Sequence, residues 1–88
     1  KAERQARIAE RRPLIKETEQ LEARMAHWQK EKSQCDERLA APALYAATDK
    51  TPLQTLLKRQ AELAQLIEQA EERWLEIHQQ LETMPAPD

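Results

Sequence analysis

Apolar side chains recur at alternating intervals of three and four residues along two stretches of the chain, first between residues 14 and 39 and then between residues 53 and 84. Such spacing keeps one narrow apolar stripe on a helix, which is typical of a coiled-coil seam. The sequence therefore predicts two long helices. Their stripe positions are Leu14, Thr18, Leu21, Met25, Trp28, Lys32, Cys35 and Leu39 in the first, and Leu53, Leu56, Gln60, Leu63, Ile67, Ala70, Trp74, Ile77, Leu81 and Met84 in the second.

A stretch with two prolines, APALYAATDKTP, separates the two stripes. Pro42 ends the first helix near residues 39–41, because the residue before a proline avoids helical backbone angles. The second helix has a start signal in Thr51 as N-cap, Pro52 at the first helical position and Gln54 three residues after the cap.

At the far end, the sequence MPAPD ends the second helix near Thr83 and leaves a tail at 85–88. We therefore expect an all-α fold: a two-helix antiparallel coiled-coil hairpin over 13–84. Its helices are expected at about 13–40 and 52–83, with a turn at 41–51.

The short connection lets the second helix return along the first, in a register where facing residue numbers add up to about 92. Leu39 then faces Leu53, and Leu14 faces Ile77. At about 1.5 Å per residue, the arms make a rod roughly 40 to 45 Å long.

Residues 1–12 form a charged segment that precedes Pro13. Ile8 and Ile15 suggest a helix that begins before the proline, so either the helix starts at Pro13 or one longer helix kinks there. We expect a kink or break, with residues 1–12 acting as a helical but loosely attached linker. The first residue is Lys rather than Met, so we expect the chain to be a piece of a larger protein.

Composition narrows the function classes. The chain has no Gly, Val, Phe or Asn, which excludes a glycine-rich phosphate loop and disfavours a sheet. A single Cys offers no disulfide framework, and neither a signal peptide nor an apolar run of about 20 residues for a membrane span is present. A cytoplasmic location is expected.

Few residues are suited to catalysis or to metal binding. The candidates Cys35, His27 and His78 are scattered along the rod by the predicted register. We expect Cys35 to be a small buried apolar side chain and both histidines to be half-exposed. A two-helix rod also lacks a pocket that would shift the pKa of a glutamate for acid catalysis. No catalytic, metal or cofactor site is expected in this chain.

Charge is balanced overall, at a formal −2, but it is unevenly distributed. Arg4, Arg7 and Arg11 share one stripe, with Lys1 and Arg12 beside it, and such a stripe can bind the phosphates of RNA or DNA. The alternative is that they pair with the acidic end of the second helix. A second basic cluster lies near the turn, beside Tyr45. The candidate nucleic-acid-binding residues are Lys1, Arg4, Arg7, Arg11, Arg12, Lys16, Lys50, Lys58 and Arg59.

Apolar residues outside the stripes leave another interpretation open. Leu57, Leu66 and Leu75 add apolar surface to the second helix, and exposed apolar surface of this kind often has a partner. The chain could thus be a generic protein-interaction or spacer coiled coil without nucleic-acid binding, either monomeric or weakly self-associating.

The stretch from residue 13 to residue 82 resembles the C-terminal coiled-coil extension of ABC-F proteins, soluble ATP-binding cassette ATPases of the Uup and YheS type. The resemblance lies in the Pro13 opening, the turn at 39–45 with its Leu44-Tyr45 pair, and the block ERWLE at 72–76. A tRNA-clasping arm like that of some synthetases has a similar periodicity.

The ABC-F resemblance implies a parent protein with two nucleotide-binding domains that hold ATP and Mg²⁺ and act on ribosomes in translation. This chain would then be a non-catalytic accessory arm. Its implied partners are rRNA, tRNA or DNA, the ribosome and the parent's own ATPase domains, with no membrane contact.

Overall fold

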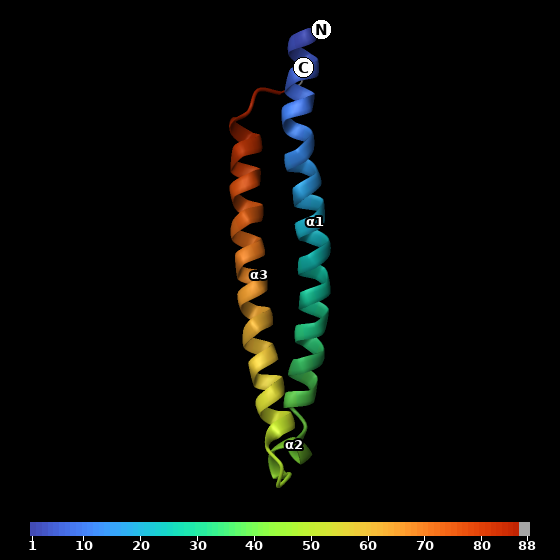
Figure 1. Ribbon diagram of the computed structural model, residues 1–88, viewed down its shortest axis with the longest axis vertical. Coiled ribbons are helices and arrows are strands. Elements are labelled where there is room, and N and C mark those ends of the chain that lie inside the picture. The colour runs from blue at the N-terminus through green and yellow to red at the C-terminus, as the bar shows by residue number, and fades with distance from the viewer. Residues whose placement is uncertain (87–88) are drawn as a thin grey trace.

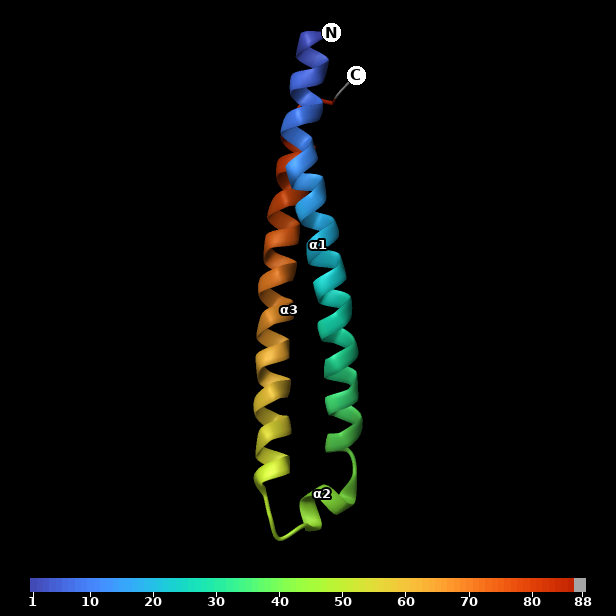
Figure 2. The same cartoon turned by 45° about the vertical axis from the view of Figure 1, so that its right-hand side comes forward.

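The computed structural model describes residues 1–86, which form an antiparallel helical hairpin (Figures 1 and 2). Helix α1 (Ala2–Leu39) and helix α3 (Thr51–Thr83) lie side by side, and the short helix α2 (Pro42–Ala46) lies at the turn between them. The rod measures 69 × 15 × 15 Å. The predicted all-α two-helix fold is therefore confirmed.

The core is a single seam between α1 and α3, built from the predicted stripe positions. One cluster near the turn buries Cys35, Leu39, Leu56 and Leu63, and a second cluster buries Leu21, Ala70 and Ile77. Leu63 and Ile77 are fully buried, at 0% exposure. Because only two helices meet here, the two tryptophans and eight other stripe residues remain half-buried.

Cross-helix contacts confirm the predicted register. Arg59 contacts Glu31, and Arg73 contacts Glu17. Near the open end, the Arg11 guanidinium donates to the Leu81 carbonyl. In each of these pairs the residue numbers add up to about 90 to 92, as expected for an antiparallel pair in the register proposed from the apolar stripes.

Helix α1 runs through Pro13 without a break, so of the expected kink or break at this position, the break is wrong. Proline removes one backbone hydrogen bond and crowds the preceding turn, but the helical turns on both sides continue.

The rod is also longer than the roughly 40 to 45 Å estimated from the arms alone. Residues 1–12 extend the first helix, and α2 adds to the turn end (Figure 1).

The turn differs from the prediction in two details. Residues 42–46 form α2, with Pro42 in its first turn, where a missing N–H costs nothing. Helix α3 begins at Thr51 with Lys50 as N-cap, so Thr51 does not cap it. Instead the Asp49 carboxylate accepts a hydrogen bond from the Thr51 backbone N–H at 3.0 Å.

The C-terminal ends of the two long helices agree with the sequence prediction. Helix α1 ends at Leu39 with Ala40 as C-cap, and α3 ends at Thr83. Of the predicted tail at 85–88, residues 87 and 88 lie outside the described residues.

Candidate nucleic-acid interface

Two of the basic residues near the N-terminus contact the end of α3. Arg11 Nη1 donates to the Leu81 carbonyl at 3.0 Å, and Arg7 Nη1 donates to the Ala86 carbonyl at 3.4 Å. Leu81 lies in the last turn of α3, where carbonyls lack partners within the helix and carry partial negative charge, so a cation is favourable there. Ala86 lies beyond Thr83, the last residue of α3. Arg11 therefore attaches residues 1–12 to the last turn of α3, and Arg7 attaches them to the segment that follows it.

The other basic residues of this end, Lys1, Arg4, Arg12 and Lys16, are exposed. A guanidinium has five N–H donors, so Arg7 and Arg11 can contact a further acceptor while each keeps its carbonyl. Together these six side chains form a positively charged surface at the open end of the rod, which we call the basic end.

The predicted basic cluster near the turn is a less favourable phosphate-binding surface than the basic end. Lys50 Nζ donates to the Tyr45 carbonyl, and Asp49 lies next to Lys50 in the chain. Lys58 is exposed, and the Tyr45 side chain is half-exposed at 50%. Positive charge and an aromatic ring are therefore both accessible here, but one of the two lysines is tied to the backbone of the turn.

Arg59 is bound to glutamates on both helices. Its Nε and Nη2 donate to the Glu31 carboxylate at 2.5 and 3.0 Å, and its Nη1 donates to Glu62 at 3.3 Å. The hydrogen bond from Arg59 lowers the pKa of the Glu31 carboxyl, and the same partners raise the pKa of Arg59. Arg59 therefore joins the two helices, which makes it the poorest of the predicted phosphate ligands.

Arg73 repeats this arrangement and was not singled out by the sequence. Its Nε and Nη2 donate to Glu17 at 2.6 and 3.0 Å, and its Nη1 donates to Glu76 at 3.2 Å. The hydrogen bond from Arg73 lowers the pKa of Glu17. We call the side of the seam that carries Glu17, Glu31, Arg59 and Arg73 the arginine flank.

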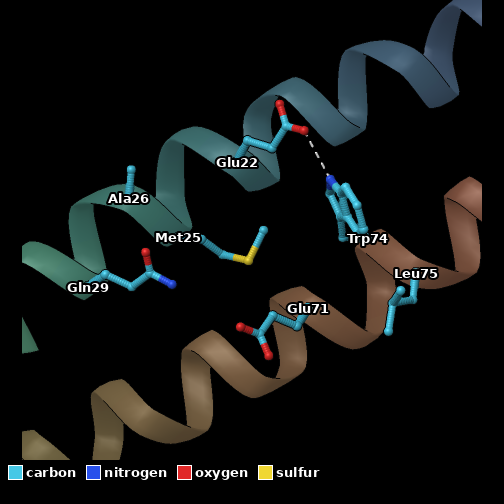
Figure 3. A pocket seen from close by; sticks show the side chains of 7 residues that line it. All are labelled: Glu22, Met25, Ala26, Gln29, Glu71, Trp74 and Leu75. Carbon is cyan, nitrogen blue, oxygen red and sulfur yellow. Dashed lines mark hydrogen bonds between the residues drawn. The ribbon is translucent and has the colours of Figure 1, made fainter.

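The opposite side of the seam, the groove flank, holds an open apolar groove of about 490 Å³. Figure 3 shows Met25, Trp74 and Leu75 around it, with a hydrogen bond from the Trp74 indole to Glu22. That bond is 3.0 Å long. The residues that line the groove are Glu22, Met25, Ala26, Gln29, Glu71, Trp74 and Leu75.

Leu66 and Leu75 do not share a surface, which corrects the apolar face expected from the sequence. They are nine residues apart, which places them about 180° apart at about 3.6 residues per turn. Leu66 is half-buried beside the arginine flank, whereas Leu75 is 53% exposed beside the groove.

The cysteine and the two histidines are separated along the rod. Cys35 is buried, as predicted, and His27 is exposed. His78 is half-buried and lies against Trp74, with ring centroids 3.9 Å apart. Within residues 1–86, no group of three or more His, Cys, Asp or Glu side chains is arranged to hold a metal ion.

A comparison with protein families identifies the hairpin. The profile of the ABC transporter C-terminal domain matches residues 12–79, which span the seam from the start of the paired region to the end of the second cluster. The chain belongs to this family. No curated protein and no solved structure matches it significantly.

Membership of the ABC transporter C-terminal domain family makes the hairpin an accessory domain of an ATP-binding cassette protein. The chain carries no glycine, so the glycine-rich nucleotide-binding loops are absent from this domain. Within the part of the chain that the structure describes, no helix has the length and apolar character needed to span a bilayer.

Proposed function

We propose that this domain is the C-terminal arm of a cytoplasmic ABC-F ATPase of the Uup or YheS type, and that its basic end contacts nucleic acid on the ribosome or elsewhere. In this proposal the parent's nucleotide-binding domains hold ATP and Mg²⁺ and perform hydrolysis. The arm supplies reach and a phosphate-binding surface. The partner is rRNA, tRNA or DNA, since all three present the same phosphate chemistry.

One observation carries the proposal: basic side chains gather at one end of a 69 Å rod while the rest of the molecule is mostly acidic. A concentrated positive surface neutralises phosphates and releases counterions, which gives binding that depends little on sequence and strongly on salt. Arg12 and Lys16 are more accessible than Arg7 and Arg11, because both are exposed whereas Arg7 and Arg11 are half-buried and donate to backbone carbonyls.

The turn offers a weaker second contact through Lys50, Lys58 and Tyr45. An exposed aromatic ring can stack on an unpaired base, whatever the base. Because Arg59 is engaged by Glu31 and Glu62, we expect its removal to affect the stability of the hairpin more than its affinity for nucleic acid.

The test uses the 88-residue chain with labelled RNA and DNA duplexes of the same sequence and with a single-stranded RNA. Fluorescence anisotropy would measure affinity over a range of salt concentrations. For duplex DNA, replacing Arg12→Gln and Lys16→Gln should reduce the slope of log affinity against log salt by about two, since each phosphate contact contributes about 0.9.

A matched control is the pair Arg24→Gln and Lys30→Gln, which removes the same two residue types from exposed positions in the middle of α1. This pair should leave the slope nearly unchanged. If both pairs reduce affinity equally, binding follows net charge alone and the basic end is not a site. If neither does, the alternative of a spacer or protein-interaction hairpin is favoured.

A further inference from the structure

The two sides of the seam differ in how they are closed. On the arginine flank, two arginines bridge α1 and α3 over the seam. On the groove flank, the polar bridges are Gln60 to Asp36 at 2.7 Å and Trp74 to Glu22 at 3.0 Å. Between those two bridges lies the groove with its apolar floor, so the seam is open to solvent over this part of the groove flank.

Exposed apolar side chains are concentrated on this same flank. Every large apolar residue of α1 and α3 that is classed as exposed lies there: Ile15 at 42%, Leu57 at 47% and Leu75 at 53%. With Thr18 and Trp74 as heptad position a, these three residues occupy positions e and b, which lie on the groove side of the seam. The apolar surface therefore continues beyond the groove in both directions along the rod.

The charge of this surface is entirely negative. Among positions e and b between residues 15 and 36 of α1 and between residues 57 and 82 of α3, there is no Lys or Arg. The acidic residues at these positions are Glu19, Glu22, Asp36, Glu68, Glu71 and Glu82. Such a surface repels the nucleic acid that the basic end attracts, so the two surfaces are suited to different partners.

We infer that the groove flank binds a basic amphipathic helix of a partner protein, with aliphatic side chains placed against Met25, Trp74 and Leu75 and with Lys or Arg facing Glu22 and Glu71. A third helix along the seam would cover the apolar floor as in helix-in-groove recognition. Its positive charges would complement the acidic borders on both helices of the hairpin. This inference does not depend on nucleic-acid binding.

A second copy of the chain fits less well. Two copies that met through this flank would place like charges against each other, because the acidic positions e and b are the same in both copies. A separate basic helix avoids this repulsion.

The probe is a synthetic amphipathic peptide with leucines at helical spacing bordered by lysines, and its counterpart has glutamate in place of each lysine. Trp74 lines the groove, so its fluorescence in a Trp28→Phe background reports occupancy. We expect the basic peptide to bind and the acidic peptide to bind at least about tenfold more weakly, because charge pairs at the border discriminate between them.

Two substitutions and one control test whether the peptide binds at the groove. Leu75→Ser and Glu71→Lys should each weaken binding of the basic peptide by about five- to tenfold. Leu75→Ser removes apolar contact, and Glu71→Lys reverses a charge. Glu72→Lys makes the same charge change one residue away, outside the groove lining, and should change the affinity less than twofold.

Several results would overturn the inference: equal binding of both peptides, no binding of the basic peptide, or an equal loss with Glu72→Lys. Sedimentation provides the remaining check. A dimer of the unmodified chain that Leu75→Ser dissociates would show that a second copy occupies the groove, and would overturn the choice of partner.

Discussion

Arg59 and Arg73 lie two heptads apart on the same edge of α3 and make equivalent contacts. Each binds a glutamate across the seam, Glu31 or Glu17, and a second glutamate three residues further along α3. The corresponding positions of α1 alternate in charge: Glu17, Arg24, Glu31 and Arg38. A slip of one heptad in either direction would therefore place Arg59 opposite an arginine, which disfavours the alternative registers.

The first prediction concerns this register. In a Cys35→Ser background, Leu21→Cys and Ala70→Cys should form a disulfide within one chain, because both residues belong to the same buried cluster. Mass spectrometry and non-reducing electrophoresis would detect it. Pairing Leu21→Cys with Leu63→Cys serves as control, since Leu63 belongs to the other cluster. Crosslinks found only between chains would contradict the hairpin.

The second prediction concerns pH. Hydrogen bonds from Arg73 and Arg59 hold the pKa values of Glu17 and Glu31 below the ordinary value of a glutamate carboxyl. A carboxyl with a lowered folded-state pKa stabilises the fold above its unfolded pKa, and this contribution is lost as the pH falls through the folded value. Thermal melts should therefore show stability falling below about pH 4.5. As the pH falls through this range, the double variant Glu17→Gln and Glu31→Gln should lose less stability than the unmodified chain, whereas Glu19→Gln should behave like the unmodified chain.

The third prediction concerns the core. Ile77 is fully buried, so Ile77→Ala should reduce the free energy of unfolding by about 2 to 5 kcal/mol. Because this can unfold a small hairpin, Ile77→Val provides a milder variant with an expected loss of about 0.5 to 1.5 kcal/mol. Leu57→Ala, at a position 47% exposed, should lose less than about 1 kcal/mol. Urea unfolding followed by circular dichroism would measure all three, and equal losses would contradict the seam.

The fourth prediction concerns Pro13, which lies inside α1. A proline in a helix interior is about 3 kcal/mol less favourable than alanine. Pro13→Ala should therefore stabilise α1 by up to this amount and slow amide exchange in residues 8–17. If the helix began at Pro13 instead, proline would be favourable there, and the substitution would bring no gain.

Most of the fold could be predicted from the sequence because the seam repeats over many heptads. Each stripe residue repeats the same evidence, and Pro42 and Pro85 limit the helices at their C-terminal ends. The start of α3 was shifted by one residue because Asp49 and Thr51 are both good capping residues. Helix α2 was missed because Pro42 ends α1 and also suits the first turn of a new helix.

The surfaces were harder to predict, because they depend on which residues of α1 face which residues of α3. Arg59 is of a residue type that often binds phosphate, and only its distance to Glu31 identifies it as a link between the helices. The register could have indicated this pair, since both residues precede stripe positions that face one another. The sequence placed Leu57 and Leu75 outside the stripes, but the exposure of Ile15 beside them on the groove flank was found only in the structure.

The position of the turn at one end of a single seam has a consequence for the order of folding. Contacts between Leu39 and Leu56 close a short loop, whereas contacts between Leu21 and Ile77 close a much longer one. The entropic cost of closing a loop rises with its length. The helices should therefore first pair beside α2, and pairing should then extend toward the basic end. Changes near the turn should alter the folding rate, and changes near the termini should mainly alter the unfolding rate.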